Sequence, residues 1–223
     1  MKSLDIYKRF LLKINKNDSN DGIAILQSHF IILFNTESTR WLGEKLKGDG
    51  DNIKLDQLDT LLEPNVELKL VKKYDDSVEF QLPENFYRHA SSYSIVDKGN
   101  CKGVKIFNFD KKALGLTATL ADDFSKPQFD FEETPFIITH NKMKIFYDDF
   151  EIKRVFETYY RVPTQIDIAG YNHPDGTPST DIDSDLVPDS IDEILNRLAV
   201  EVNRQYQDNE SVALRKDAIN TEP

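Results

Sequence analysis

The chain has 223 residues, 39% hydrophobic and 30% charged, which is enough to bury a core as one large domain or two small ones. Its 28 lysines and arginines against 39 aspartates and glutamates give a net charge of −11, which disfavours a surface for nucleic-acid phosphates unless basic residues are segregated. The single cysteine, Cys101, excludes an intramolecular disulfide and a cysteine-based zinc cage. Because the sequence has neither a membrane-length apolar run nor a secretory signal pattern, we expect a protein made and used in the cytoplasm, without a membrane partner.

Residues 1–64 are predicted to form an N-terminal helical part of the fold. A short helix is expected around residues 7–14 and a longer one from Gln27 to Lys47, because apolar side chains recur there at helical steps and Gly48 and Gly50 follow. The residues that define these two faces are Tyr7, Phe10, Leu11 and Ile14, then Phe30, Leu33, Phe34, Glu37 and Trp41. Four leucines between residues 55 and 62 suggest one more short helix before Pro64.

Residues 65–168 predict a β-rich middle, because the apolar period changes from helical to two at Val66. A hairpin is expected around the acidic turn at residues 75–76, and a second one with its tip at Asn141-Lys142. The further segments read as strands are GVKIFNF, LGLTATLAD, PFIITHNKMKIFYDD and KRVFETYYRVP. These segments favour an antiparallel sandwich or barrel.

Residues 169–208 predict an acidic loop and a closing helix. The stretch TDIDSDLVPD opens like a calcium loop, but Leu186 stands where such a loop needs glycine and Asp192 where it needs glutamate. A helix start explains more residues, since Ser190 and Glu193 form an S-x-x-E capping box before an apolar helical face. Residues 209–223 carry few apolar groups and predict an extended tail.

These elements predict an α+β fold in which amphipathic helices from both ends of the chain pack together around a β-rich middle.

Motifs for catalysis or cofactors are not found, so we expect a protein that is not an enzyme and has no cofactor or metal. The four histidines lack ligand spacing, and His173, Asp175 and Ser179 are better explained as a turn-rich loop than as a triad. The Tyr159-Tyr160-Arg161 cluster is typical of interface anchors, although neighbouring tyrosines in a strand face opposite sides and one of them should point outward.

Several short segments, in their order along the chain, resemble those of a known protein family. They are Leu82-Pro83-Glu84-Asn85-Phe86 before strands, Tyr159-Tyr160-Arg161-Val162-Pro163 after a hairpin, and Asp183-Ser184-Asp185 before the closing helix. With the N-terminal FLLKINKNDSNDGIAI and LFNTESTRWLGEKL, they span nearly the whole chain, which resembles the head-to-tail connector, or tail-ring, proteins of crAss-like bacteriophages. The large β-middle departs from the mostly helical portal adaptors of other tailed phages.

The resemblance implies a structural virion protein in the tail or neck, assembled in the cytoplasm of the bacterial host. Such a protein forms a homo-oligomeric ring, commonly of twelve copies, that docks to the portal protein and carries further tail-ring proteins. Genomic DNA would pass through its channel without specific binding. The tail would be an arm for the portal or a neighbouring subunit, with Val212 and Leu214 as candidate contacts beside Tyr159, Tyr160 and Arg161.

Two other classes of function stay open. One is a β-rich virion module that binds carbohydrate or a host surface, which would gain if Tyr159 and Tyr160 were exposed together in a groove. The other is a hydrolase whose site has no sequence motif, which would need titratable side chains that converge in one pocket.

Overall fold

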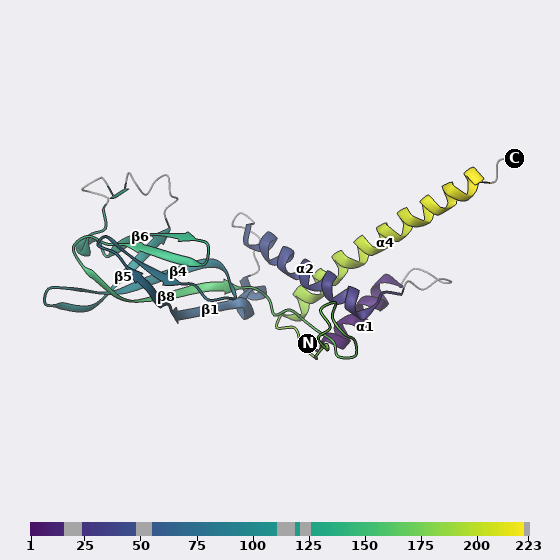
Figure 1. The fold of residues 1–223 in the computed structure, drawn as a ribbon, viewed down its shortest axis with the longest axis horizontal. Coiled ribbons are helices and arrows are strands. Elements are labelled where there is room, and N and C mark those ends of the chain that lie inside the picture. The colour runs from purple at the N-terminus through teal and green to yellow at the C-terminus, as the bar shows by residue number, and fades with distance from the viewer. Residues whose placement is uncertain (16–23, 48–54, 111–118, 121–125, 221–223) are drawn as a thin grey trace. The chain divides into compact units, whose positions relative to one another are not determined.

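The chain forms two compact units in a computed structural model that describes residues 1–15, 24–47, 55–110, 119–120 and 126–220, with side chains as far as Gln205. Unit 1 combines Met1–Thr60 with Pro163–Pro223, and unit 2 is the continuous segment Leu61–Val162 (Figure 1). The three long helices lie in the first unit and the sheet lies in the second, which also holds a 3-10 turn at Phe129–Phe131. The predicted α+β fold with a β-rich middle is therefore confirmed.

Unit 1 is built on three helices, α1 (Ser3–Ile14), α2 (Gln27–Lys47) and α4 (Pro188–Asn220). Helix α4 contacts both α1 and α2, so the two ends of the chain share one core, as predicted. Aromatic rings fill much of it, with the centroid of Phe30 lying 5.0 Å from that of Phe10 and 5.8 Å from that of Phe34. The other buried apolar side chains of these helices include Ile6, Ile14, Trp41, Leu42, Ile191, Ile194, Leu195 and Leu198.

The start of α4 differs from the prediction. The helix begins at Pro188, whose fixed φ suits the first helical position, and the N–H of Ile191 donates to the carbonyl of Val187 at 3.1 Å. Ser190 therefore lies inside the first turn, where its buried hydroxyl has no hydrogen-bond partner among the described residues, and the predicted capping box is wrong.

The end of α4 also differs, because the helix continues to Asn220 where an extended tail was predicted for residues 209–223. The stretch contains alanine, leucine, lysine and arginine, which are good helix formers. The short helix predicted before Pro64 is instead two 3-10 turns, Leu55–Gln57 and Asp59–Leu61, because a strand begins directly at Leu62.

Unit 2 is one sheet of eight strands in the order β1-β8-β4-β5-β6-β7-β3-β2. The strands are β1 (Leu62–Glu67), β2 (Lys69–Lys73), β3 (Ser77–Gln81), β4 (Phe86–Lys98), β5 (Cys101–Asp110), β6 (Glu133–Thr139), β7 (Lys142–Phe146) and β8 (Glu151–Arg161). All neighbouring strands are antiparallel except β5 and β6, which are parallel, so the predicted wholly antiparallel sheet is wrong at this pair. A parallel pair needs a crossover of a dozen or more residues, and the chain between Asp110 and Glu133 has that length.

The sheet is curled into a half-barrel, because its two edge strands are neighbours in sequence. Only Leu68 separates β1 from β2, and its N–H still donates to the carbonyl of Val155 on β8 at 2.9 Å. The inner face encloses the apolar core, which includes Val78, Phe80, Val96, Ile106, Phe136, Met143, Ile145 and Val155.

Two local features of unit 2 differ from the sequence-based predictions. Strand β4 was not predicted, because its inward face carries the buried hydroxyls of Ser92 and Ser94 in place of apolar side chains. The second hairpin turns at His140-Asn141, one residue earlier than predicted, with His140 at a φ of 57°. The strand predicted at residues 114–122 falls almost entirely outside the described residues.

Candidate functional site

The most elaborate polar structure of the molecule is the segment of residues 163–187, here called the acidic loop, between β8 and α4. It contains no regular strand, only isolated bridges that join Asp167 to Ile182 and Asn172 to Pro178. A connection this long in a compact domain is usually functional, so it is the first place to look for a site.

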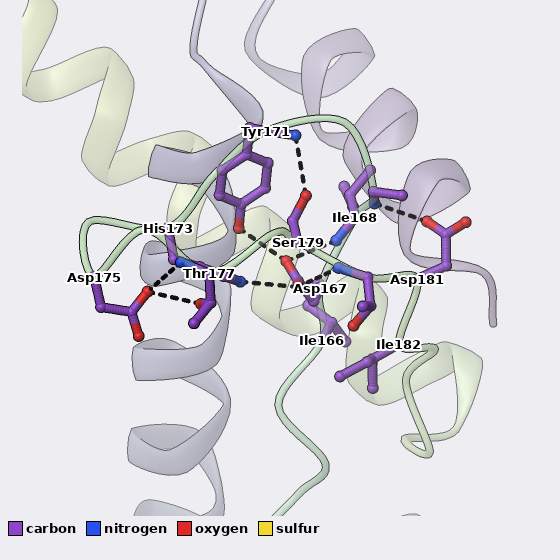
Figure 2. A network of polar contacts seen from close by, with 12 residues as sticks. Ile166, Asp167, Ile168, Tyr171, His173, Asp175, Thr177, Ser179, Asp181 and Ile182 are labelled. Carbon is purple, nitrogen blue, oxygen red and sulfur yellow. Dashed lines mark hydrogen bonds and ion pairs between the residues drawn. The ribbon is translucent and has the colours of Figure 1, made fainter.

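The carboxylate of Asp167 is the centre of this loop (Figure 2). Its Oδ1 accepts hydrogen bonds from the N–H of Ile168 at 2.9 Å and the hydroxyl of Tyr171 at 2.8 Å. Its Oδ2 accepts from the N–H of Thr180 at 2.9 Å and lies 3.1 Å from Nε2 of His173. Four groups from both arms of the loop therefore converge on one buried side chain.

The electrostatics of this centre keep Asp167 ionised. Burial pushes its pKa upward, but hydrogen bonds from Thr180, Tyr171 and Ile168 outweigh burial and hold the pKa below its ordinary value. Burial and the same carboxylate raise the pKa of Tyr171 to about 12. A carboxylate offers about four acceptor positions, and all four are used here, so Asp167 is a structural anchor and is not available as a general base or metal ligand.

The alternate carboxylates of the D-x-D-x-D pattern also bind backbone groups. Asp181 accepts from the N–H of Ala169 at 2.9 Å, Asp183 from that of Ser3 at 3.1 Å, and Asp185 from that of Thr164 at 3.1 Å. Thr164 and Ala169 lie in the acidic loop and Ser3 lies in α1, so each carboxylate binds a separate backbone group.

No group of three or more metal-ligating side chains occurs in the described part of the chain.

The acidic loop also holds the start of α1. The amino group of Met1 donates to the carbonyl of Ser184 at 2.9 Å, and the N–H of Ser184 donates back to the carbonyl of Met1 at 3.1 Å. The hydroxyl of Ser3 donates to the carbonyl of Ile182. With the bond from Asp183, these contacts join residues about 180 positions apart and make the loop a part of the unit 1 core.

A cavity of about 410 Å³ lies between α2 and the acidic loop. Its lining combines apolar side chains, Ile31, Ile32 and Ile182 among them, with the ring of His173. The loop is fixed to α2 beside it, because the amide of Asn35 both donates to the carbonyl of Ile166 and accepts from its N–H, at 3.0 and 2.9 Å.

No Ser-His-Asp arrangement forms in this loop. His173 lies against Asp167, Asp175 accepts from the N–H and hydroxyl of Thr177, and the hydroxyl of Ser179 accepts from the N–H of Tyr171. The three side chains of the possible triad each have a separate structural partner, as expected for a turn-rich loop.

A second polar cluster, which the sequence analysis missed, lies on the inner side of the sheet in unit 2. Glu157 is fully buried, its Oε1 is 2.7 Å from Nδ1 of His89, and its Oε2 has no hydrogen-bond partner among the described residues. Burial raises the pKa of Glu157, against the lowering effect of His89. Alternation along β8 was the available signal, because Val155, Glu157 and Tyr159 all face inward.

The candidate interface residues do not share one exposed surface. Tyr159 is 3% exposed, and its hydroxyl donates to Asn85 at 2.9 Å. Tyr160, on the opposite side of β8, is half-buried, and Nε of Arg161 lies 3.0 Å from Glu63. Val212 and Leu214 lie in the last part of α4, beyond the described side chains, so their interface role stays a prediction.

Comparisons with known proteins assign no family. No protein-family model matches the chain, and no curated protein matches its sequence. Among the described residues, no helix has the length and apolar character to cross a membrane.

Proposed function

We propose that this chain is a non-enzymatic structural subunit of the head-to-tail connector of a crAss-like bacteriophage. In this role it forms a ring, docks to the portal, extends the DNA channel and serves as a platform for tail assembly. Several segments resemble tail-ring proteins in their order along the chain, and this resemblance is the reason for proposing that family. The structural observation that supports an assembly role is the length of α4.

The described side chains of α4 are buried only in the first part of this long helix. Its last buried side chain among those described is Ala199, Val200 is 71% exposed, and the helix continues to Asn220 (Figure 1). At 1.5 Å per residue, the stretch beyond Ala199 is roughly 30 Å long. Isolated helices are marginal in water, so in an assembly the last turns of α4 would be stabilised by packing against another chain.

The acidic loop supports the same kind of role. Its carboxylates are fixed by backbone N–H groups, so the loop is held in one conformation. A surface that is rigid before binding loses less conformational entropy when a partner docks. Catalysis would instead need an available acid, base or nucleophile, and the carboxylate of Asp167 is fully used.

The carbohydrate-binding alternative loses its main support. This hypothesis would be supported if Tyr159 and Tyr160 were exposed in a common groove, but Tyr159 is buried.

The test is mass determination by light scattering with gel filtration, on the chain alone and mixed with the portal protein of its own phage. We expect a stoichiometric, ring-sized complex with the portal. Deletion of residues 209–223 should weaken portal binding while leaving the melting temperature nearly unchanged, because this segment follows the last described core residue of α4.

The matched control is a deletion of residues 221–223 alone, which leaves α4 intact and should bind the portal like the full chain. A full chain that stays monomeric with portal present at micromolar concentration would overturn the proposal.

A further inference from the structure

The outer face of the sheet carries four lysines in a regular array on β2 and β7, on either side of β3. In the strand register, Lys69 and Lys142 both pair with Gln81, and Lys72 and Lys144 both pair with Glu79. We call these four lysines the lysine face. Strand spacing places the lysines of each row roughly 10 Å apart across the sheet.

These lysines are largely free to meet an anion. No carboxylate partner of Lys69, Lys72 or Lys144 occurs among the described residues, and Lys142 lies 3.6 Å from Glu79 with its side chain 43% exposed. The ammonium groups of Lys72 and Lys144 approach the ring of Tyr74, at 4.6 and 4.8 Å from its centroid. The ring holds the two charges beside each other without neutralising them.

The composition of the lysine face favours a phosphate backbone over a protein partner. Protein interfaces are depleted in lysine and centre on buried aromatic, methionine or arginine anchors. Here the centre of the array is Gln81 and Glu79. A surface hollow of about 550 Å³ is lined by Glu79, Lys142 and Lys144 together with Thr139, His140 and Asn141. Lysines act as point charges for phosphates and carry no sequence information.

We propose that the lysine face binds the phosphate backbone of nucleic acid without sequence preference. The inference is independent of the connector role, because it depends only on the charges and register of unit 2. The single carboxylate at its centre, Glu79, leaves an excess of positive charge in a chain whose net charge is −11. With screening over about 10 Å at 0.1 M salt, the acids elsewhere in the chain weaken this attraction without abolishing it.

The test is fluorescence anisotropy of a labelled DNA duplex of about 30 base pairs with the full chain over a salt series that starts near 50 mM. Contacts from about four lysines predict a slope of roughly −3 to −4 for the logarithm of the association constant against the logarithm of salt concentration. The triple variant Lys69→Gln, Lys72→Gln, Lys144→Gln should bind at least about tenfold more weakly at low salt and show a slope near −1.

The matched control is Lys2→Gln, Lys8→Gln, Lys47→Gln, which removes the same charge from exposed lysines of unit 1 and should bind the duplex like the unaltered chain. Equal loss in both triple variants would show that only net charge matters and would overturn the proposal. It also fails if no binding is seen at low salt, or if light scattering shows self-association that depends on these lysines while duplex binding is absent.

Discussion

Asp167 in unit 1 and Glu157 in unit 2 are both buried carboxylates, yet folding shifts their pKa values in opposite directions. Asp167 receives four donors, which hold its pKa below the ordinary value. Burial raises the pKa of Glu157, and the contacts of this carboxylate with His89 and Ser92 do not outweigh burial. The number of donors around a buried carboxylate, more than burial itself, therefore decides whether its charge stabilises the fold.

The two units also divide the charge of the chain unequally. Unit 1 holds 13 lysines and arginines against 22 aspartates and glutamates, whereas unit 2 holds 15 against 17. In unit 1 the carboxylates of the acidic loop are occupied by backbone N–H groups, and in unit 2 the lysines point outward from an apolar core. Unit 1 should therefore depend on polar contacts more strongly than unit 2 does.

The largest expected effect comes from the apolar core of unit 2. Phe136→Ala removes a fully buried ring from the inner face of the sheet and should lower the free energy of unfolding by about 3–5 kcal/mol. Phe107→Ala is the matched control, because Phe107 is 55% exposed and its loss should cost less than about 1 kcal/mol. Urea denaturation of both variants measures the difference, and equal effects would contradict the assignment of the core.

The next effect tests the polar centre of unit 1. Asp167→Asn places an amide NH2 against groups that already donate, and should cost about 2–4 kcal/mol in urea denaturation. Asp181→Asn, with a single backbone donor, should cost less than about 1 kcal/mol. If Asp181→Asn lowered the free energy of unfolding as much as Asp167→Asn, Asp167 would be no more important to the acidic loop than Asp181.

The stability of the unaltered chain and that of Asp167→Asn should depend differently on pH. Because the pKa of Asp167 is lowered by folding, its stabilisation is present above the ordinary aspartate pKa and is lost as the pH falls through the folded pKa. The unaltered chain should therefore lose this contribution in acid, while Asp167→Asn should show a smaller acid loss.

The smallest expected effect is a stabilisation, and it comes from a substitution of Glu157. Because its pKa is raised by burial, its contribution is most favourable below the ordinary value of 4.5 and is lost as the pH rises toward the folded pKa. Glu157→Gln removes the buried charge and keeps an acceptor for His89, so at pH 7 it should be more stable by about 1 kcal/mol.

Thermal unfolding of Glu157→Gln between pH 4 and 8 is the measurement. The variant should melt a few degrees higher at neutral pH and show a flatter pH dependence than the unaltered chain. If it instead melts lower at pH 7, the pairing of Glu157 with His89 outweighs the cost of burial.

Sequence patterns predicted the helices of unit 1 more reliably than the sheet of unit 2. Helical periodicity located α1 and α2 because the residues that make one face are neighbours three and four positions apart. Strand β4 escaped because Ser92 and Ser94 occupy inward positions and bond with Asn108 on β5, a partner that no local window contains.

For the candidate site, the sequence located the acidic loop and favoured a helix start over a calcium loop for its carboxylates. It did not single out Asp167, whose donors Tyr171 and Thr180 come from both arms of the loop. The bonds of Asp183 to Ser3 and of Asp185 to Thr164 also escaped, because segments distant in sequence meet only when the unit folds.

The sequence by itself determined the α+β class, the amphipathic helical ends and the strand-rich middle, because these follow from side-chain periods within single segments. Tertiary structure alone decided the parallel pair of β5 and β6, the four donors around Asp167 and the lysine face. Lys69 and Lys144 lie on one surface only because β3 pairs with both of their strands, and such pairing is set by the register of the whole sheet.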